Sequence, residues 1–320
     1  MKIKEIYELA IEMGINADPR GREAVEKVLA KARQKYEKRK DKPEEEKGYF
    51  DEESLRNPYA DSRILYGEPS LEIKKIMVGV DLETPEVLLA DRLNSKGAGI
   101  DLLLAHHPEG VALTSLADVM SLQEGYMAAW GVRPNLAQAV MEERIDQVRR
   151  SLSVGNHQRA VEAARLLDIP LICVHTPTDN LVNDFLTKLI AEKEPEEAGD
   201  LLDLIKEIPE YALAAEANNP PRLVAGKKER KVGKVYVDFT GGTSGPDGQY
   251  EKLAESGIST VVDMYSGEKQ IKAAKDKHLN LISAGHMASD SLGINLLLDA
   301  IEEKGVEIVA VSGIIRVCRR

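Results

Sequence analysis

The fold is decided by the stretch KIMVGVDLETPEVLLADRLNSKGAGIDLLLAHHPEG, residues 75–110. It opens with a short β-branched run, which is typical of a buried strand. Thr84 and Pro85 suit the start of a helix, and glycines follow where that helix should end. A second apolar strand, IDLLLA, leads directly into a His-His-Pro sequence. Strand, helix and strand over this length predict a βαβ unit with parallel strands and a right-handed crossover.

A related pattern returns further along the chain. The strand GKVYVDF ends in Asp238 as KIMVGVD ends in Asp81, and the strand LNLISAGH ends in His286. Between them lie a strand, ISTVVDM, and a helix, EKQIKAAKDK; a last helix, SLGINLLLDAIEEKG, precedes the final strand VEIVAVSGI. The recurrence predicts a second α/β half that resembles the first, with spacings too variable for a strict repeat.

The segments outside these two halves are helical or charged. Apolar residues from Ile3 to Met13 fall on one helical face, and Gly14 is expected to end this helix. Residues 18–53 are strongly charged, which predicts a solvated helix and a linker broken near Pro43; a partner-binding arm is the alternative. The expected division of the chain is an N-terminal helix and extension over 1–64, a first α/β lobe over 65–225 and a second over 226–320.

Composition limits the partners. The net charge of −11 over 320 residues argues against nucleic acid or an anionic membrane held by broad electrostatics. Two cysteines cannot build a disulfide framework, which favours a reducing compartment. The start, MKIKEIYELAIEM, lacks the apolar core of a secretory signal, and no run approaches the roughly 20 apolar residues of a membrane span. A cytoplasmic protein with no membrane partner is predicted.

Four histidines follow apolar strands: His106, His107, His175 and His286. Ligands gather at the carboxyl ends of strands in parallel α/β sheets, so these side chains are candidates for one site. Adjacent residues on a strand point to opposite faces, but Pro108 favours a turn that lets both neighbouring imidazoles converge. Neutral imidazole is a preferred ligand of zinc, iron and copper.

Two carboxylates complete the set. Asp179 follows the strand end at His175 by a short turn, and Asp290 stands four residues after His286. Asp290 has two interpretations, a metal ligand or the N-cap of the last helix, a position that aspartate often takes. Three histidines with two carboxylates form a mixed nitrogen and oxygen set suited to zinc, iron or manganese.

The chain resembles the Nif-three-like family, also described as GTP cyclohydrolase type-two-like. The matching motifs are VGVDLETPEVLLADRLNSKGAGIDLLLAHHPEG, ICVHTPTDNLVNDFL and SAGHMASDSLGINLLLDAIE, in this order. The resemblance covers approximately residues 65–317 and the first helix. It implies two related α/β lobes, with mixed or parallel sheets, that face a shared dinuclear metal site, and a toroidal homohexamer. To these the sequence adds a charged helical N-terminal extension.

Carried onto this sequence, the resemblance implies two divalent metal ions per subunit, zinc, iron or manganese. The implied metal ligands are His106, His107, Asp179, His286 and Asp290. The chain departs from the family at Asp290, where glutamate is common. It departs again in Tyr59-Ala60-Asp61-Ser62-Arg63, where relatives often have Trp-Asp-Asn, and in the charged insertion over 18–56.

Two functions remain open from sequence. The first is a metal-dependent hydrolase of a nucleotide or related small molecule, in which His175 serves as catalytic proton carrier. The second is a non-catalytic protein that stores, delivers or senses metal, or a ring-shaped scaffold. The discriminating feature is an open coordination position, which a catalytic site keeps for water.

Overall fold

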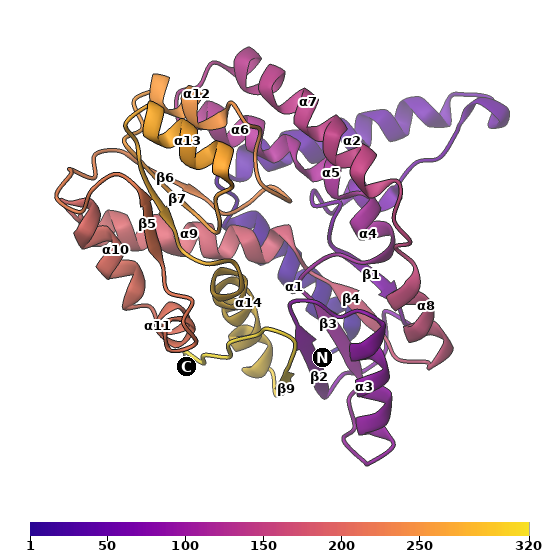
Figure 1. Cartoon of the computed structure of the whole chain (residues 1–320). Coiled ribbons are helices and arrows are strands. Elements are labelled where there is room, and N and C mark those ends of the chain that lie inside the picture. Colours follow the sequence, from indigo (N-terminus) through magenta and orange to yellow (C-terminus); the bar gives the residue numbers. More distant parts are fainter. Residues whose placement is uncertain (320) are drawn as a thin grey trace.

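The computed structural model describes residues 1–319 and has two α/β halves that meet around central helices (Figure 1). The strands are β1 (Arg63–Tyr66), β2 (Lys75–Gly79), β3 (Leu102–Ala105), β4 (Leu171–Cys173), β5 (Arg222–Ala225), β6 (Val235–Asp238), β7 (Thr260–Asp263), β8 (Asn280–Ser283) and β9 (Glu307–Ala310). The first helices are α1 (Ile3–Asn16), α2 (Arg22–Lys40), α3 (Thr84–Asn94), α4 (Gly110–Thr114), α5 (Leu116–Val119), α6 (Ser121–Ala129) and α7 (Pro134–Leu152). The others are α8 (Arg159–Leu166), α9 (Thr176–Lys193), α10 (Ala198–Lys206), α11 (Pro209–Glu216), α12 (Gln249–Glu255), α13 (Glu268–Asp276) and α14 (His286–Glu302).

The first sheet has the order β1-β4-β3-β2-β9. Strands β2, β3, β4 and β9 run parallel, and β1 is antiparallel at the edge. The predicted βαβ unit of β2, α3 and β3 is confirmed, although Glu83 rather than Thr84 precedes the helix. The buried strands β2 and β3 consist of apolar residues because helices cover both faces of a parallel sheet.

The second sheet has the order β5-β8-β7-β6, again with parallel strands and one antiparallel edge strand, β5. The α/β class with two related lobes is therefore confirmed. The halves are not contiguous in sequence, because the final strand β9 pairs with β2 in the first sheet. That strand was predicted to belong to the second lobe; its apolar pattern fits either sheet, and only the chain path decides between them. The domain division at residues 64 and 225 stays a prediction.

Two central helices, α9 and α14, pack against each other between the sheets, and α1 packs along α9. Gly293 of α14 touches the α9 backbone so closely that a Cβ there would overlap the carbonyl oxygen of Thr178. Gly14 lies inside α1, and a Cβ at this residue would be 2.6 Å from Cα of Pro177. The prediction that Gly14 ends the first helix is wrong; this glycine lets α1 approach α9.

The charged extension forms α2, which reaches away from the body of the molecule (Figure 1). Only Val25 and Leu29 of this helix are buried, as expected for a solvated helix. The chain returns through two short 3₁₀ turns, Glu44–Glu46 and Glu52–Leu55. None of the helices within residues 1–319 has the length and apolar character needed to traverse a lipid bilayer.

Candidate metal centre

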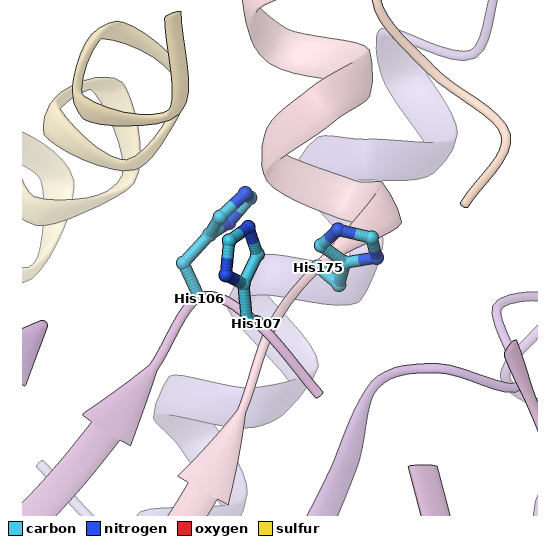
Figure 2. A group of neighbouring side chains, drawn as sticks. All are labelled: His106, His107 and His175. Atoms are coloured by element: carbon cyan, nitrogen blue, oxygen red, sulfur yellow. The ribbon is translucent and has the colours of Figure 1, made fainter. Parts of the chain in front are cut away.

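The four predicted histidines come together at the ends of strands from both sheets. His106 and His107 follow β3, and His175 follows β4 (Figure 2). His286 is the first residue of α14, three residues beyond the end of β8. The ring centroids of His106 and His107 lie 5.2 Å apart, those of His106 and His175 4.9 Å, and those of His107 and His286 5.2 Å.

Both predicted carboxylates reach the same place from the central helices. Asp179 lies in the first turn of α9, and Asp290 lies in the second turn of α14. Helix α14 begins at His286 and Gly285 occupies its N-cap, so the capping interpretation of Asp290 is wrong. The side chain of Asp290 is fully buried, which places its charge among the histidines.

The carboxylate of Asp290 divides its two oxygens between different histidines. Its Oδ1 lies 3.5 Å from Nε2 of His106, and its Oδ2 lies 3.4 Å from Nε2 of His286 and 3.6 Å from Nε2 of His107. On the other side, Nε2 of His106 lies 3.5 Å from Oδ1 of Asp179. The five side chains therefore form one continuous group of potential metal ligands, with Asp290 at its centre.

Several of these atoms are buried and make no hydrogen bond within residues 1–319. They are His106 Nε2, Asp179 Oδ1 and both carboxylate oxygens of Asp290. Buried polar atoms in proteins are nearly always hydrogen-bonded, because an unpaired one loses its hydration without compensation. Imidazole nitrogen and carboxylate oxygen are ligands of divalent transition metals. The donor set thus fits a metal.

Three sets of side chains at this point offer ligand atoms that all lie within 4.8 Å of one another. They are His106 with Asp179 and Asp290, His107 with His286 and Asp290, and His106 with His107 and His175. A further set, Asp299 with Glu302 and Cys318, lies at the far end of α14, where both acids contact Arg316. The arrangement of the first three sets supports a metal-binding protein.

In three of the imidazoles the second ring nitrogen, Nδ1, makes a hydrogen bond that holds the ring in place. Nδ1 of His107 lies 2.7 Å from Oδ1 of Asp81, and Nδ1 of His175 lies 2.8 Å from Oδ2 of Asp61. Nδ1 of His106 lies 3.0 Å from the hydroxyl of Thr178. When Nδ1–H donates to a carboxylate, Nε2 keeps its lone pair for a cation.

Burial and mutual charge shift the pKa values of His107, His286 and Asp290 in the direction that favours metal binding, and that of Asp179 in the opposite direction. Burial lowers the pKa of His107 and of His286, which keeps both imidazoles neutral. Burial would raise the pKa of Asp290, but the neighbouring histidines outweigh it and lower that pKa. Burial, aided by the charge of Asp290, raises the pKa of Asp179 well above its usual range. A bound cation would stabilise the ionised form of Asp179.

The site opens into a cavity of about 360 Å³. Its titratable lining residues are His107, His175, His286, Asp81, Glu109, Asp179, Asp238, Asp263 and Asp290, and no lysine or arginine within residues 1–319 lines it. Sequence analysis noted Asp61 and Asp81 without giving either a role in the site. It missed Asp263 and Glu109 altogether, since a single acid at a strand end or turn carries no local signal.

The remaining histidines and Cys173 have other surroundings. His157 and His278 are not part of the donor sets. Cys173 is buried in β4, and burial raises the pKa of its thiol to about 12, so it is not a nucleophile at neutral pH.

Comparison with known proteins places this geometry in a family. No protein-family model and no curated protein matches the chain. Among solved structures, a NIF3 superfamily protein from Sphaerobacter thermophilus is similar over 80% of this chain and 92% of its own, with 27% identity and a TM-score of 0.71. The resemblance to the NIF3 superfamily is therefore confirmed at the level of sequence similarity and fold.

A second solved structure has a similar fold. Reduced HcgD from Methanocaldococcus jannaschii is similar over 77% of this chain and 87% of its own, with 16% identity and a TM-score of 0.50. At this identity the likeness concerns the fold alone. A shared fold does not specify the role of a residue, so each role in this chain has to be argued from its own geometry.

Proposed function

We propose that this NIF3 superfamily chain is a dinuclear metal-dependent hydrolase that acts on a nucleotide or related small molecule. In this proposal His106, Asp179 and Asp290 hold one divalent cation, and His107, His286 and Asp290 hold the second. The cations are zinc, iron or manganese, in keeping with the mixed nitrogen and oxygen donors.

The observation that carries the proposal is the position of Asp290. Both of its oxygens are buried and unpaired within residues 1–319, and they face different imidazoles at 3.4–3.6 Å. A buried carboxylate with no hydrogen bond is costly unless it is compensated by positive charge. Two cations, one against each oxygen, would compensate it, and a carboxylate can bridge in this way. An aspartate at this position, although glutamate is common in the family, is therefore suited to the bridging role.

The accessibility of the proposed metal site favours a hydrolase over a metal-storage protein. Each proposed cation has three protein ligands, the number that catalytic zinc sites commonly use while leaving room for water or substrate. The site faces a cavity of about 360 Å³, and the side chain of His286 is 37% exposed. Divalent cations in such a site lower the pKa of bound water and polarise the bond to be cleaved.

His175 is the proposed proton carrier. Asp61 holds its Nδ1 at 2.8 Å, and its Nε2 lies 3.8 Å from Oδ2 of Asp179. The imidazole lines the cavity, so its Nε2 can exchange a proton with a molecule bound there. Asp61 is itself fixed by the hydroxyl of Thr176 at 2.6 Å, which keeps the ring oriented.

The experiment is metal quantification on protein purified without a histidine tag, followed by a hydrolysis screen over nucleotides and phosphoesters with that metal restored. We expect two equivalents of metal per chain and turnover that is lost in His175→Gln while metal content stays. His107→Ala should lose metal without unfolding, and His157→Ala, outside the donor sets, should match the wild type. One equivalent or none would refute the dinuclear site; two equivalents without turnover on any substrate would favour the storage alternative.

The assembly and location form part of the same proposal. We expect a homohexamer, as the family resemblance implies, and a cytoplasmic location, as the composition indicates. Light scattering at micromolar concentration tests the assembly, and a monomer would contradict it.

A further inference from the structure

A row of polar side chains crosses the second sheet at its carboxyl edge. Asp238 of β6 pairs in register with Asp263 of β7, which pairs with Ser283 of β8. Register partners on parallel strands point to the same face. Both aspartates line the cavity that also exposes His107, Asp179 and His286. The proposed metal ligands and this acidic row thus line the same cavity.

The two aspartates differ in how they are bonded. Asp263 accepts from the hydroxyl of Tyr250 at 2.7 Å, from the hydroxyl of Ser283 at 2.8 Å, and from Ser266. It is therefore anchored on every side. Asp238 accepts a hydrogen bond from Nε2 of Gln249, at 3.1 Å from its Oδ2, and its Oδ1 has no hydrogen-bond donor within residues 1–319.

The counterpart of Asp238 in the first sheet has a histidine partner that Asp238 lacks. Asp81 follows β2 as Asp238 ends β6, and Asp81 binds the imidazole of His107 beyond the neighbouring strand. In the second sheet the neighbouring strand ends in Asp263, so Asp238 faces an acid instead of an imidazole. Burial and the charge of Asp263 together raise the pKa of Asp238 to about 7. No lysine or arginine within residues 1–319 lines the cavity to offset the negative charge of these two aspartates.

An aromatic ring lies beside this row. Tyr265, two residues beyond Asp263, lines the same cavity, and its ring centroid is 5.2 Å from that of His286. Tyr265 is 49% exposed, so its ring is accessible from the cavity. A planar ligand can stack on such a face.

We infer that Asp238 is a specificity-determining residue that accepts hydrogen bonds from the N–H donors of a planar nitrogen heterocycle carrying an amino group, held beside Tyr265. The inference deepens the proposed function and rests on it, because the proposed cations would act on the group to be hydrolysed. A cavity of about 360 Å³ is at the small end of ligand pockets and suits one or two rings. An anionic group would be repelled by the acidic row and could be accepted only at the cations.

The test compares two probes that differ by one amino group, 2-aminopyrimidin-4-one and pyrimidin-4-one, titrated calorimetrically into the metal-loaded protein. A charge-assisted hydrogen bond that only the amino compound can make should give it about tenfold higher affinity. Asp238→Asn replaces an acceptor by a partial donor and should abolish the difference without changing metal content. Asp247→Asn, an exposed acid paired with Lys269, is the control and should behave as the wild type.

Equal affinity of the two probes for the wild type, no measurable binding of the amino compound at millimolar concentration, or unchanged discrimination in Asp238→Asn would each overturn the inference. Should Asp238→Asn fail to fold, Asp238→Ser removes the carboxylate with a smaller side chain and is measured instead. Metal content is measured on the same samples. A chain that discriminates between the probes yet holds fewer than two cations would refute the dinuclear proposal alone, so the two failures are distinguishable.

Discussion

Gly293 of α14 lies against Thr178 of α9 so closely that there is no room for a side chain between them. This contact fixes the separation of the two helices that carry Asp290 and Asp179. Gly293→Ala should push α14 away from α9, destabilise the protein by about 1 to 3 kcal/mol and reduce metal content. Denaturant unfolding with metal analysis checks both. Gly248→Ala, where nothing lies within 4 Å, is the matched control; full metal content in Gly293→Ala would contradict this role of the contact.

Asp290→Asn tests the bridge. The amide keeps the shape of the side chain but loses its charge, so we expect loss of at least one cation per chain. Asp290→Glu should retain metal better than Asp290→Asn, since relatives commonly have glutamate there. Metal content per chain is the measurement. Because Gly285 and not Asp290 caps α14, neither change should act through the helix end. Full occupancy in Asp290→Asn would remove this residue from the site.

Asp81→Asn tests the support of His107. The carboxylate accepts from Nδ1 of His107 at 2.7 Å, and its loss leaves the imidazole less basic and less well oriented. Changes in such supporting groups typically reduce metal affinity about 10- to 100-fold. Competition with a chelator measures the affinity. An unchanged affinity would mean that the hydrogen bond does not act on the metal.

Asp179→Asn should separate stability from metal binding. Burial raises the pKa of Asp179, so in metal-free protein its ionised form opposes folding at neutral pH. The variant removes that cost and should be more stable than the wild type without metal, by about 1 to 3 kcal/mol, while binding metal less well. The sign follows from the raised pKa: the wild type recovers as pH falls towards about 4, the carboxyl pKa in the unfolded chain. Thermal unfolding in chelator across pH 4–8 tests this, and a less stable variant at pH 7 would contradict it.

The outer part of the charged extension should be dispensable for the metal site. The rings of Tyr36 in α2 and Phe50 contact each other at a tilted angle with centroids 5.3 Å apart, so residues 37–49 can be replaced by a short glycine-serine linker between them. Metal content should not change. The replacement stops short of residue 18, because Asp18 accepts a hydrogen bond from the hydroxyl of Tyr59 at 3.0 Å. Loss of metal on replacing 37–49 would give the arm a role in the site.

The sequence by itself determined the local elements and the chemistry of the candidate site. Apolar runs, glycines and a proline predicted β2, α3 and β3, and histidines directly after strands predicted where imidazoles would gather. These signals are local: strand length and helix caps depend on neighbours a few residues away. The family motifs carried the ligand set as a prediction, and the structure brings those side chains together.

The tertiary structure decided what depends on residues far apart in the chain. It placed β9 beside β2, showed that Gly14 and Gly293 are points of close helix approach, and gave Asp290 a position inside α14 instead of at its cap. It also brought Asp238 into the cavity that His107, His175 and His286 line. An apolar strand fits either sheet and a glycine fits either a helix end or a helix contact, so only packing in three dimensions distinguishes them.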